Sequence, residues 1–328
     1  MNRLAGAVLT VIVLAALPAV TAAAPKLSPL VLPLTEATAL NDRGQVAGYA
    51  HLGTVDEHHA YLWQDGILTD LGNLAPASAD PRAIFTVPGD LNNRGQVVGS
   101  SETAEGTEPH AFLWQDGKMS DLGTLWGIAS SATAINERGQ VVGSAAINAV
   151  PDLQHAILWD DGLIIDLGTL GGSESWAADI NNQGQIVGAS DLPSDPHTRV
   201  RHAVLWEGGV MTDLGALGGV GSEAYAINDR GQVIGRIEMA SGPAHAFLWE
   251  AGTMIDLGAF VLEGINERGQ AVGYSPEGAP IRWQAGVVTE LEMPAAALEG
   301  RAREINARGE IVGTVFELHD VRGSLWTK

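Results

Sequence analysis

The chain has 328 residues, a formal net charge of -21 from 18 basic and 39 acidic residues, and no cysteine. So acidic a chain lacks the basic surface that nucleic acid and anionic lipid require, which excludes both as expected partners. Without disulfides the fold must be stabilised by a hydrophobic core, and a chain of this length is long enough to supply one.

The first residues, MNRLAGAVLTVIVLAALPAVTAAAP, combine one arginine, an apolar run from Leu4 to Ala16 and a string of small residues. This is the three-part layout of a secretory signal peptide, with cleavage expected between Ala22 and Pro25. The run is shorter than the roughly 20 residues that a membrane-spanning helix needs. We therefore expect a signal peptide over residues 1–24 and a single secreted or periplasmic domain over residues 25–328, with no membrane span.

One phrase then recurs seven times. Its copies are LNDRGQVAG from Leu40, LNNRGQVVG from Leu91, INERGQVVG from Ile135, INNQGQIVG from Ile180, INDRGQVIG from Ile227, INERGQAVG from Ile265 and INARGEIVG from Ile305. Successive asparagines lie 38 to 51 residues apart, a period typical of solenoid or propeller units. Asn-x-x-Gly fits a type I turn with a left-handed glycine and an asparagine side chain bonded to nearby backbone.

The same phrase also resembles a calcium-binding loop, because an asparagine and an acid precede a glycine. In six of the seven copies, however, an arginine stands immediately before the glycine. A cation beside the ligands disfavours calcium. We interpret the phrase as a turn and expect neither a metal nor a cofactor.

A second phrase follows each copy of the first. It reads HAYLWQDGILTDLG from His59, HAFLWQDGKMSDLG from His110, HAILWDDGLIIDLG from His155, HAVLWEGGVMTDLG from His202 and HAFLWEAGTMIDLG from His245, with a worn copy from Ile281 and a truncated GSLWTK at the end. Each unit thus contains four short stretches rich in β-branched and aromatic residues, separated by glycine-containing turns. This pattern predicts four-stranded antiparallel units and no helices.

The two ends of the chain suggest how the units are arranged. The last unit ends two residues after Trp326 without a fourth strand, whereas residues 26–34 (KLSPLVLPL) belong to no repeat. If residues 26–34 supply the missing strand, the units close into an all-β, seven-bladed propeller and leave no open sheet edges at the ends. Pro29 and Pro33 suit an outermost strand, where a missing backbone donor costs little.

The two recurrent phrases and the DLGTLGG ending of residues 166–172 resemble the HAF-type extracellular repeat of secreted bacterial proteins. The resemblance covers nearly all of the chain after residue 24, although the histidine and the DLG ending fade in the last two units. It implies secretion and a repeat fold, and it implies no particular activity.

Two residue types recur in the second phrase and invite a chemical interpretation. The five histidines can bind metal or transfer protons, but one histidine per blade leaves them too far apart to share an ion. We expect each to bond within its own blade, to one of the aspartates Asp70, Asp121, Asp166, Asp213 and Asp256, because buried polar groups need partners. The seven recurrent tryptophans are expected to pack between neighbouring blades.

The connections between strands differ in how much they vary. The two turns within each blade keep nearly fixed lengths and share one side of the ring, here the turn face. The second-to-third strand connections and the blade-to-blade connections vary widely and share the opposite side, here the variable face. Binding residues tend to lie on loops held by a rigid scaffold, so we place the ligand surface on the variable face. The candidate ligand-binding residues are Trp126, Trp176, Glu174, Glu223, Arg199 and Arg201.

Each candidate also fits ordinary solvated or packed loop structure, and the two tryptophans, both expected in connecting segments, fit stacking on a ligand and packing on the core equally well. No nucleophile elbow, phosphate loop or zinc motif is present, so no catalytic residue is assigned. Three functions stay open: a monomeric, non-enzymatic scaffold that binds an extracellular protein or glycan; a hydrolase or lyase acting on polysaccharide or peptide with acids at the mouth of the ring; and a structural envelope component.

Overall fold

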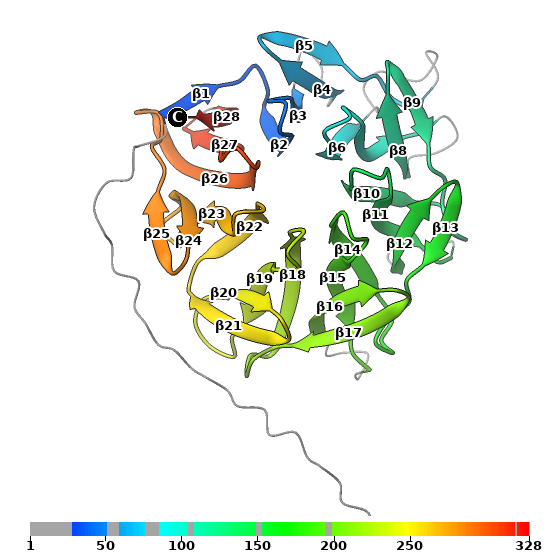
Figure 1. Ribbon diagram of the computed structural model, residues 1–328. Helices are drawn as coiled ribbons and strands as arrows, with labels where there is room; N and C mark the ends of the chain where they lie inside the picture. Colours follow the sequence, from blue (N-terminus) through cyan, green and yellow to red (C-terminus); the bar gives the residue numbers. More distant parts are fainter. Residues whose placement is uncertain are drawn as a thin grey trace, which may run out of the picture.

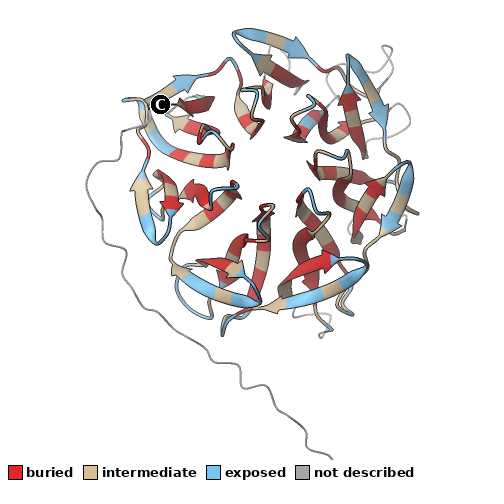
Figure 2. Cartoon of the chain, in the orientation of Figure 1, coloured by how far each residue is buried: buried red, intermediate tan, exposed pale blue. Residues whose placement is uncertain are grey.

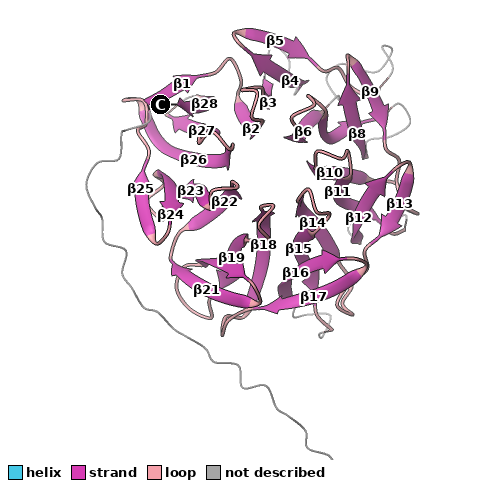
Figure 3. Cartoon of the chain, in the orientation of Figure 1, coloured by secondary structure: helices cyan, strands magenta, loops and turns pink. Residues whose placement is uncertain are grey.

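A computed structural model of the protein describes residues 28–50, 59–75, 85–103, 108–148, 153–193, 199–318 and 320–327. The expected signal peptide lies outside these residues. The described residues form 28 strands and no helix (Figure 3). The strands make seven four-stranded antiparallel sheets, arranged as blades of a ring (Figure 1). The predicted seven-bladed β-propeller is therefore confirmed.

Within each blade the strands follow one another from the centre of the ring to its rim (Figure 1). Blade 1 contains β2 (Glu36–Leu40), β3 (Val46–Ala50), β4 (His59–Gln64) and β5 (Ile67–Asp70). Blade 2 contains β6 (Thr86–Leu91), β7 (Val97–Glu102), β8 (Pro109–Gln115) and β9 (Lys118–Asp121). Blade 3 contains β10 (Ser130–Ile135), β11 (Val141–Ala146), β12 (Gln154–Asp160) and β13 (Leu163–Asp166). Blade 4 contains β14 (Ser175–Ile180), β15 (Ile186–Asp191), β16 (Arg201–Glu207) and β17 (Val210–Gly215).

The remaining blades follow the same order. Blade 5 contains β18 (Gly221–Ile227), β19 (Val233–Glu238), β20 (His245–Glu250) and β21 (Thr253–Gly258). Blade 6 contains β22 (Val261–Ile265), β23 (Gln270–Tyr274), β24 (Pro280–Gln284) and β25 (Val287–Glu290). Blade 7 contains β26 (Ala297–Ile305), β27 (Ile311–Glu317), β28 (Val321–Thr327) and, from the other end of the chain, β1 (Ser28–Val31).

The ring closes where β1 pairs with β28. The two strands are antiparallel, with Pro29 opposite Trp326, and β1 is the outermost strand of blade 7. Beyond β1 the pairing continues, because the N–H of Leu32 donates to the carbonyl of Gly323 at 2.9 Å. Leu32 and Leu34 are buried in the core between blades 7 and 1. The predicted closure by the N-terminal segment is confirmed, and among the described residues its regular strand is Ser28–Val31.

The Asn-x-x-Gly turns join the first and second strands of each blade. The asparagine Oδ1 accepts hydrogen bonds from the backbone two and four residues later, as Asn136 does from Arg138 at 3.0 Å and Gln140 at 3.1 Å. The turn glycine is left-handed, with a φ of 86° at Gly139. These contacts confirm the predicted turn. They also occupy the asparagine Oδ1, the side-chain atom that a metal in this loop would bind.

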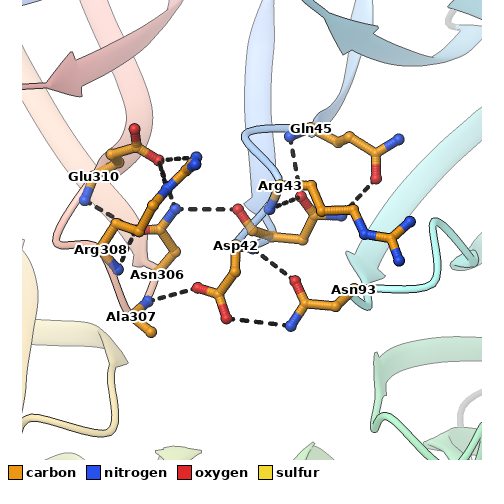
Figure 4. A network of polar contacts seen from close by, with 9 residues as sticks. Asp42, Arg43, Gln45, Asn93, Asn306, Ala307, Arg308 and Glu310 are labelled. Atoms are coloured by element: carbon orange, nitrogen blue, oxygen red, sulfur yellow. Dashed lines mark hydrogen bonds and ion pairs between the residues drawn. The ribbon is translucent and has the colours of Figure 1, made fainter.

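The same asparagines also connect the blades. Each side-chain amide donates to the backbone carbonyl of the equivalent asparagine in the next blade, and all seven side chains are buried. The bonds run in order from Asn41 to Asn92, Asn136, Asn181, Asn228, Asn266 and Asn306, and from Asn306 back to Asn41. Figure 4 shows the closure, where Asp42 also accepts a bond from the N–H of Ala307 at 2.8 Å. The repeat thus encodes a closed ring of hydrogen bonds.

Seven hydrophobic clusters fill the spaces between neighbouring blades, and each contains one of the recurrent tryptophans. Two of the indoles also donate to the preceding blade: Trp206 Nε1 to the carbonyl of Leu167 at 3.0 Å, and Trp326 Nε1 to the carbonyl of Glu292 at 2.6 Å. The prediction that these tryptophans pack between blades is confirmed. Among the strands, the outermost ones contain most of the segments coloured as exposed (Figure 2).

Every innermost strand has a bulge three residues before its asparagine, where the register with the second strand shifts. A bulge places two residues opposite one on the partner strand. Here it turns the extra residue toward the axis of the ring, and all seven extra residues line a central channel of about 290 Å³: Thr38, Gly89, Thr133, Ala178, Tyr225, Glu263 and Arg303. The bulge thus directs the most variable position of the inner strand into the channel.

None of the described segments forms a helix long and apolar enough to cross a membrane.

Candidate functional site

The five repeat histidines are the first or second residue of the third strand of a blade, beside the aspartate of the DLG ending. This aspartate is the last residue of the fourth strand in blades 1 to 3 and lies two residues before its end in blades 4 and 5. The Nδ1 to carboxylate distances are 2.8 to 3.1 Å in the pairs His59–Asp70, His110–Asp121, His155–Asp166, His202–Asp213 and His245–Asp256. The predicted bonding of each histidine within its own blade is therefore confirmed. Among the described residues no three or more histidine, cysteine, aspartate or glutamate side chains are grouped as a metal would require.

A cleft of about 280 Å³ opens on the variable face where blades 4 and 5 meet. One wall is the segment 199–201, which leads into β16. The others are residues 220–223 at the start of β18 and the end of β19, with Arg236 and Glu238. The cleft is close in size to the smallest ligand pockets of proteins, at about 300 Å³.

Arg201, the first residue of β16, is the centre of a charged network beside the cleft. Its Nε donates to Asp191 Oδ1 at 3.1 Å, and its two terminal nitrogens lie 3.8 Å from Glu174 Oε2 and 3.7 Å from Glu223 Oε1. Its guanidinium carbon lies 4.6 Å from the centroid of the Trp176 ring, within cation–π distance. One side chain therefore joins groups from both blades.

Two further arginines extend this network. Arg199 Nη1 donates to Glu174 Oε2 at 2.7 Å. Arg236 Nε lies 3.1 Å from Glu223 Oε2, and the hydroxyl of Tyr225 donates to the same oxygen at 3.2 Å. Burial raises the pKa of the Tyr225 phenol above its ordinary value, so its proton stays available for this bond. The carboxylates thus hold the arginines in fixed positions.

The structure therefore brings five of the six candidate residues together: Trp176, Glu174, Glu223, Arg199 and Arg201. The sixth, Trp126, is 70% exposed in the connection between β9 and β10, at the junction of blades 2 and 3. The expected position of Trp176 in a connecting segment is wrong, because β14 begins at Ser175 and the tryptophan is its second residue. Whether these residues bind a ligand stays a prediction.

Sequence reasoning missed three members of the network, Asp191, Tyr225 and Arg236. Arg236 follows the second glycine of its phrase, where the other copies carry tyrosine, serine, alanine or threonine. A charged residue that departs from the repeat at this position is the signal that could have identified it. Asp191 carries no such signal, because its role depends on lying opposite Arg201 in the pairing of β15 with β16.

Three carboxylates line or adjoin the central channel, two residues before the turn asparagine in blades 2, 4 and 7. Each accepts a backbone N–H from the next blade: Asp90 from Ile135 at 2.9 Å, Asp179 from Ile227 at 2.8 Å, and Glu304 from Leu40 at 3.4 Å. In the first two, the other carboxylate oxygen accepts the N–H of the following residue at 2.7 Å. These side chains therefore link neighbouring blades.

The same carboxyl groups hold their protons unusually tightly. Although Asp179 and Glu304 line the channel, the packed blades remove most of the hydration of these carboxyl groups. This burial raises the pKa of Asp90 to about 7 and that of Asp179 to about 6. Burial likewise raises the pKa of Glu304 well above its ordinary value, with the negative charges of Asp90 and Asp179 adding to the effect. At neutral pH Asp90 and Asp179 therefore lie close to their titration range.

No family model matches the sequence, and no curated protein sequence matches it. Solved structures do resemble it. The β-propeller domain of the Trilobed protease from Pyrococcus furiosus is 10% identical, with 88% of this chain and 94% of that chain covered and a TM-score of 0.58.

Two peptidases show the same similarity over part of their length. A puromycin-hydrolyzing peptidase from Mycobacterium tuberculosis is 14% identical, with 90% of this chain and 53% of that chain covered and a TM-score of 0.56. An acylaminoacyl peptidase from Pyrococcus horikoshii is 13% identical, with 84% and 49% covered and a TM-score of 0.51. The chain thus spans about half the length of these peptidases. At such low identities the similarity shows the β-propeller fold alone.

Proposed function

We propose that the protein is a non-enzymatic β-propeller that binds a ligand in the cleft between blades 4 and 5. The observation that carries this proposal is the convergence of Arg199, Arg201 and Arg236, with the carboxylates that hold them, on one cleft of the variable face. These residues depart from the repeat, whereas the turn asparagines and the tryptophans that shape and connect the blades follow it. A scaffold that repeats its structural residues and varies one cleft fits a binding role.

The location and partner class belong to the same proposal. The expected signal peptide and the resemblance to HAF-type extracellular repeats support export of the protein to the periplasm or the outside of the cell. There it acts as a monomer on an extracellular glycan or protein. The net charge of -21 disfavours nucleic acid as the partner.

The alternative of a hydrolase or lyase is favoured by one observation. A carboxyl group with a pKa near 7, as at Asp90, suits general acid–base catalysis at neutral pH. Both oxygens of Asp90 and of Asp179, however, already accept backbone N–H groups. We therefore assign these side chains to joining the blades and prefer binding to catalysis.

The experiment is a binding screen of the mature protein against glycans and metabolites, repeated with a variant whose cleft is filled. Val220 lines the cleft and is exposed, so Val220→Trp fills it without disturbing the core. Val210→Trp places the same side chain at an exposed position of the outer strand β17 and serves as the control.

We expect Val220→Trp to lose the ligand that the parent protein and Val210→Trp both bind. An Asp116→Ala variant on the turn face should also keep it. Full binding by Val220→Trp, or loss of binding in Asp116→Ala, would place the site elsewhere and contradict the proposal. Asp42 is unsuitable for this control because it holds the contacts at the ring closure.

A further inference from the structure

The charges beside the cleft are arranged in two levels. The side chains of Arg199, Arg201 and Arg236 are 51%, 35% and 41% exposed, whereas those of Glu174, Asp191 and Glu223 are only 10%, 4% and 13% exposed. The arginine side chains are therefore more exposed than the carboxylates that pair with them. A ligand entering the cleft therefore meets these arginines and the exposed carboxylate of Glu238 before the buried carboxylates.

The arginines keep hydrogen-bonding capacity for such a ligand. A guanidinium carries five N–H donors in a planar fork. In the described structure Arg199 uses one donor on Glu174, and Arg201 uses one on Asp191. The stacking of Arg201 on Trp176 and its ion pairs fix the plane of its fork before a ligand arrives. Such pre-organised forks match a carboxylate, which accepts paired N–H bonds in one plane.

The other walls of the cleft indicate what carries that carboxylate. Among the described residues that line the cleft, only Val200 and Val220 have apolar side chains, whereas Glu223 and Glu238 offer hydrogen-bond acceptors. Apolar peptide side chains would find little surface there. A sugar ring presents hydroxyl groups that both donate and accept, and so it fits a lining that contains both kinds of partner.

From these observations, and resting on the proposed function of the cleft, we infer that the ligand is a carboxylate-bearing sugar, a uronic acid at or near the end of a short oligosaccharide. The carboxylate binds the arginine forks, and the ring hydroxyls bond to Glu223 and Glu238. With a volume of about 280 Å³, the cleft can enclose only a small number of sugar rings. Because the whole chain carries a charge of -21, a long polyanion is repelled away from the cleft, which favours a short chain.

Isothermal titration calorimetry with trigalacturonate and with its methyl ester tests this inference. The ester keeps the rings and hydroxyls, removes the negative charges and adds one methyl group to each carboxyl group. We expect the acid to bind about tenfold or more tightly than the ester, since charge-assisted pairs are the stronger ones. Binding of the acid should also weaken as salt is raised from about 0.05 to about 0.5 M, because part of the site is exposed to solvent.

Single substitutions then test whether trigalacturonate binds in the cleft. Arg199→Gln and Arg236→Gln each remove one cation from the cleft, and Arg138→Gln removes one from an exposed turn on the opposite face. The cleft variants should weaken trigalacturonate binding by about tenfold, and Arg138→Gln should leave it unchanged. Thermal melting of each variant confirms that it is folded. Arg236→Lys keeps the charge but not the fork, and it should restore only part of the affinity.

The possible outcomes test the uronate ligand and the cleft separately. Equal binding of acid and ester, both lost in Val220→Trp, would overturn the uronate and leave the cleft as the site. Binding of the acid that survives both glutamine variants and Val220→Trp would overturn the cleft as well. Absence of any heat with trigalacturonate at millimolar concentration would overturn the inference, while the wider screen still tests the proposed function.

Discussion

The side-chain amide of Asn306 donates a hydrogen bond of 3.1 Å to the backbone carbonyl of Asn41, and this contact joins the last blade to the first. The two residues are 265 positions apart in the chain. Six equivalent bonds connect the other blades, so the chain closes its ring with the contact that it uses everywhere else. One asparagine per repeat therefore determines both a turn and a junction between blades.

Asn306→Ala tests the strength of this junction. The change removes the acceptor of two backbone N–H groups, those of Arg308 and Glu310, and the donor to Asn41. Because the asparagine is buried, we expect a loss of about 2 to 4 kcal/mol in the free energy of unfolding, measured by denaturant titration. Ala307→Ser, on the same turn, is the control and should change little. A loss below about 0.5 kcal/mol would show that water replaces the asparagine without penalty.

Gly143→Ala tests the second glycine of the repeat. This residue lies opposite the bulge of β10, and a Cβ there would stand 2.0 Å from the carbonyl oxygen of Ser131. We expect a loss of about 3 kcal/mol or more, because backbone must move to admit the methyl group. Gly162→Ala is the matched control, since that glycine has a φ of 79° but nothing within 4 Å of its Cβ position. The control should lose only the strain of the left-handed backbone, about 1 to 2 kcal/mol, and equal losses would refute the steric account.

The channel carboxylates predict that stability depends on pH. The pKa of Asp90 rises from its ordinary value of 3.8 to about 7 in the folded protein, and a group whose pKa rises on folding stabilises the fold at low pH. Its contribution is fully present below about pH 4 and is lost as the pH rises through about 7. Between pH 5 and pH 8 we expect the free energy of unfolding to fall by about 2 kcal/mol from this group.

Asp90→Ala is the control for that dependence, because blades 1, 3 and 5 carry alanine at the same position: Ala39, Ala134 and Ala226. The variant should be less stable at pH 5 and should show a shallower fall in stability toward pH 8. An unchanged slope, measured by denaturant titration at both values, would mean that other groups produce it.

The exposure of the histidine–aspartate pairs predicts that replacing one histidine has only a small effect on stability. The His110 and Asp121 side chains are 25% and 44% exposed, so solvent screens their contact at 2.9 Å. We expect His110→Ala to cost about 1 kcal/mol or less, as exposed pairs do. The measurement is the melting temperature of the variant beside that of His155→Ala, whose pair is less exposed. A loss above about 3 kcal/mol at His110 would indicate that the histidine has a partner beyond its aspartate.

Much of the fold follows from residues that repeat. The Asn-x-x-Gly turns, the histidine–aspartate pairs and the closing strand were predictable because each depends on neighbours in one blade or on a count of strands. The inter-blade bond of Asn136 to Asn181 was not, because it depends on how two blades are spaced. The bulges were not predictable for a similar reason. The second glycine of each phrase lies opposite a bulge, but a glycine in a strand does not reveal which carbonyl of the partner strand lies opposite it.

The candidate site shows the same limit. Topology placed Arg199 and Arg201 on the variable face, because the ends of antiparallel strands alternate. It did not reveal that Arg236, at the end of another blade's second strand, lies beside them. Residues that depart from the repeat identified part of the cleft, and only the packing of blade 4 on blade 5 completed it.

Hydrogen–deuterium exchange of the mature protein, with and without the tightest-binding compound of the glycan and metabolite screen, tests most directly whether the cleft is the ligand site. We expect the compound to slow exchange in peptides that contain residues 199–201, 220–223 and 236–238 and to leave the Asn-x-x-Gly turns unchanged. Protection confined to those turns, or to the β9–β10 connection that carries Trp126, would contradict the account.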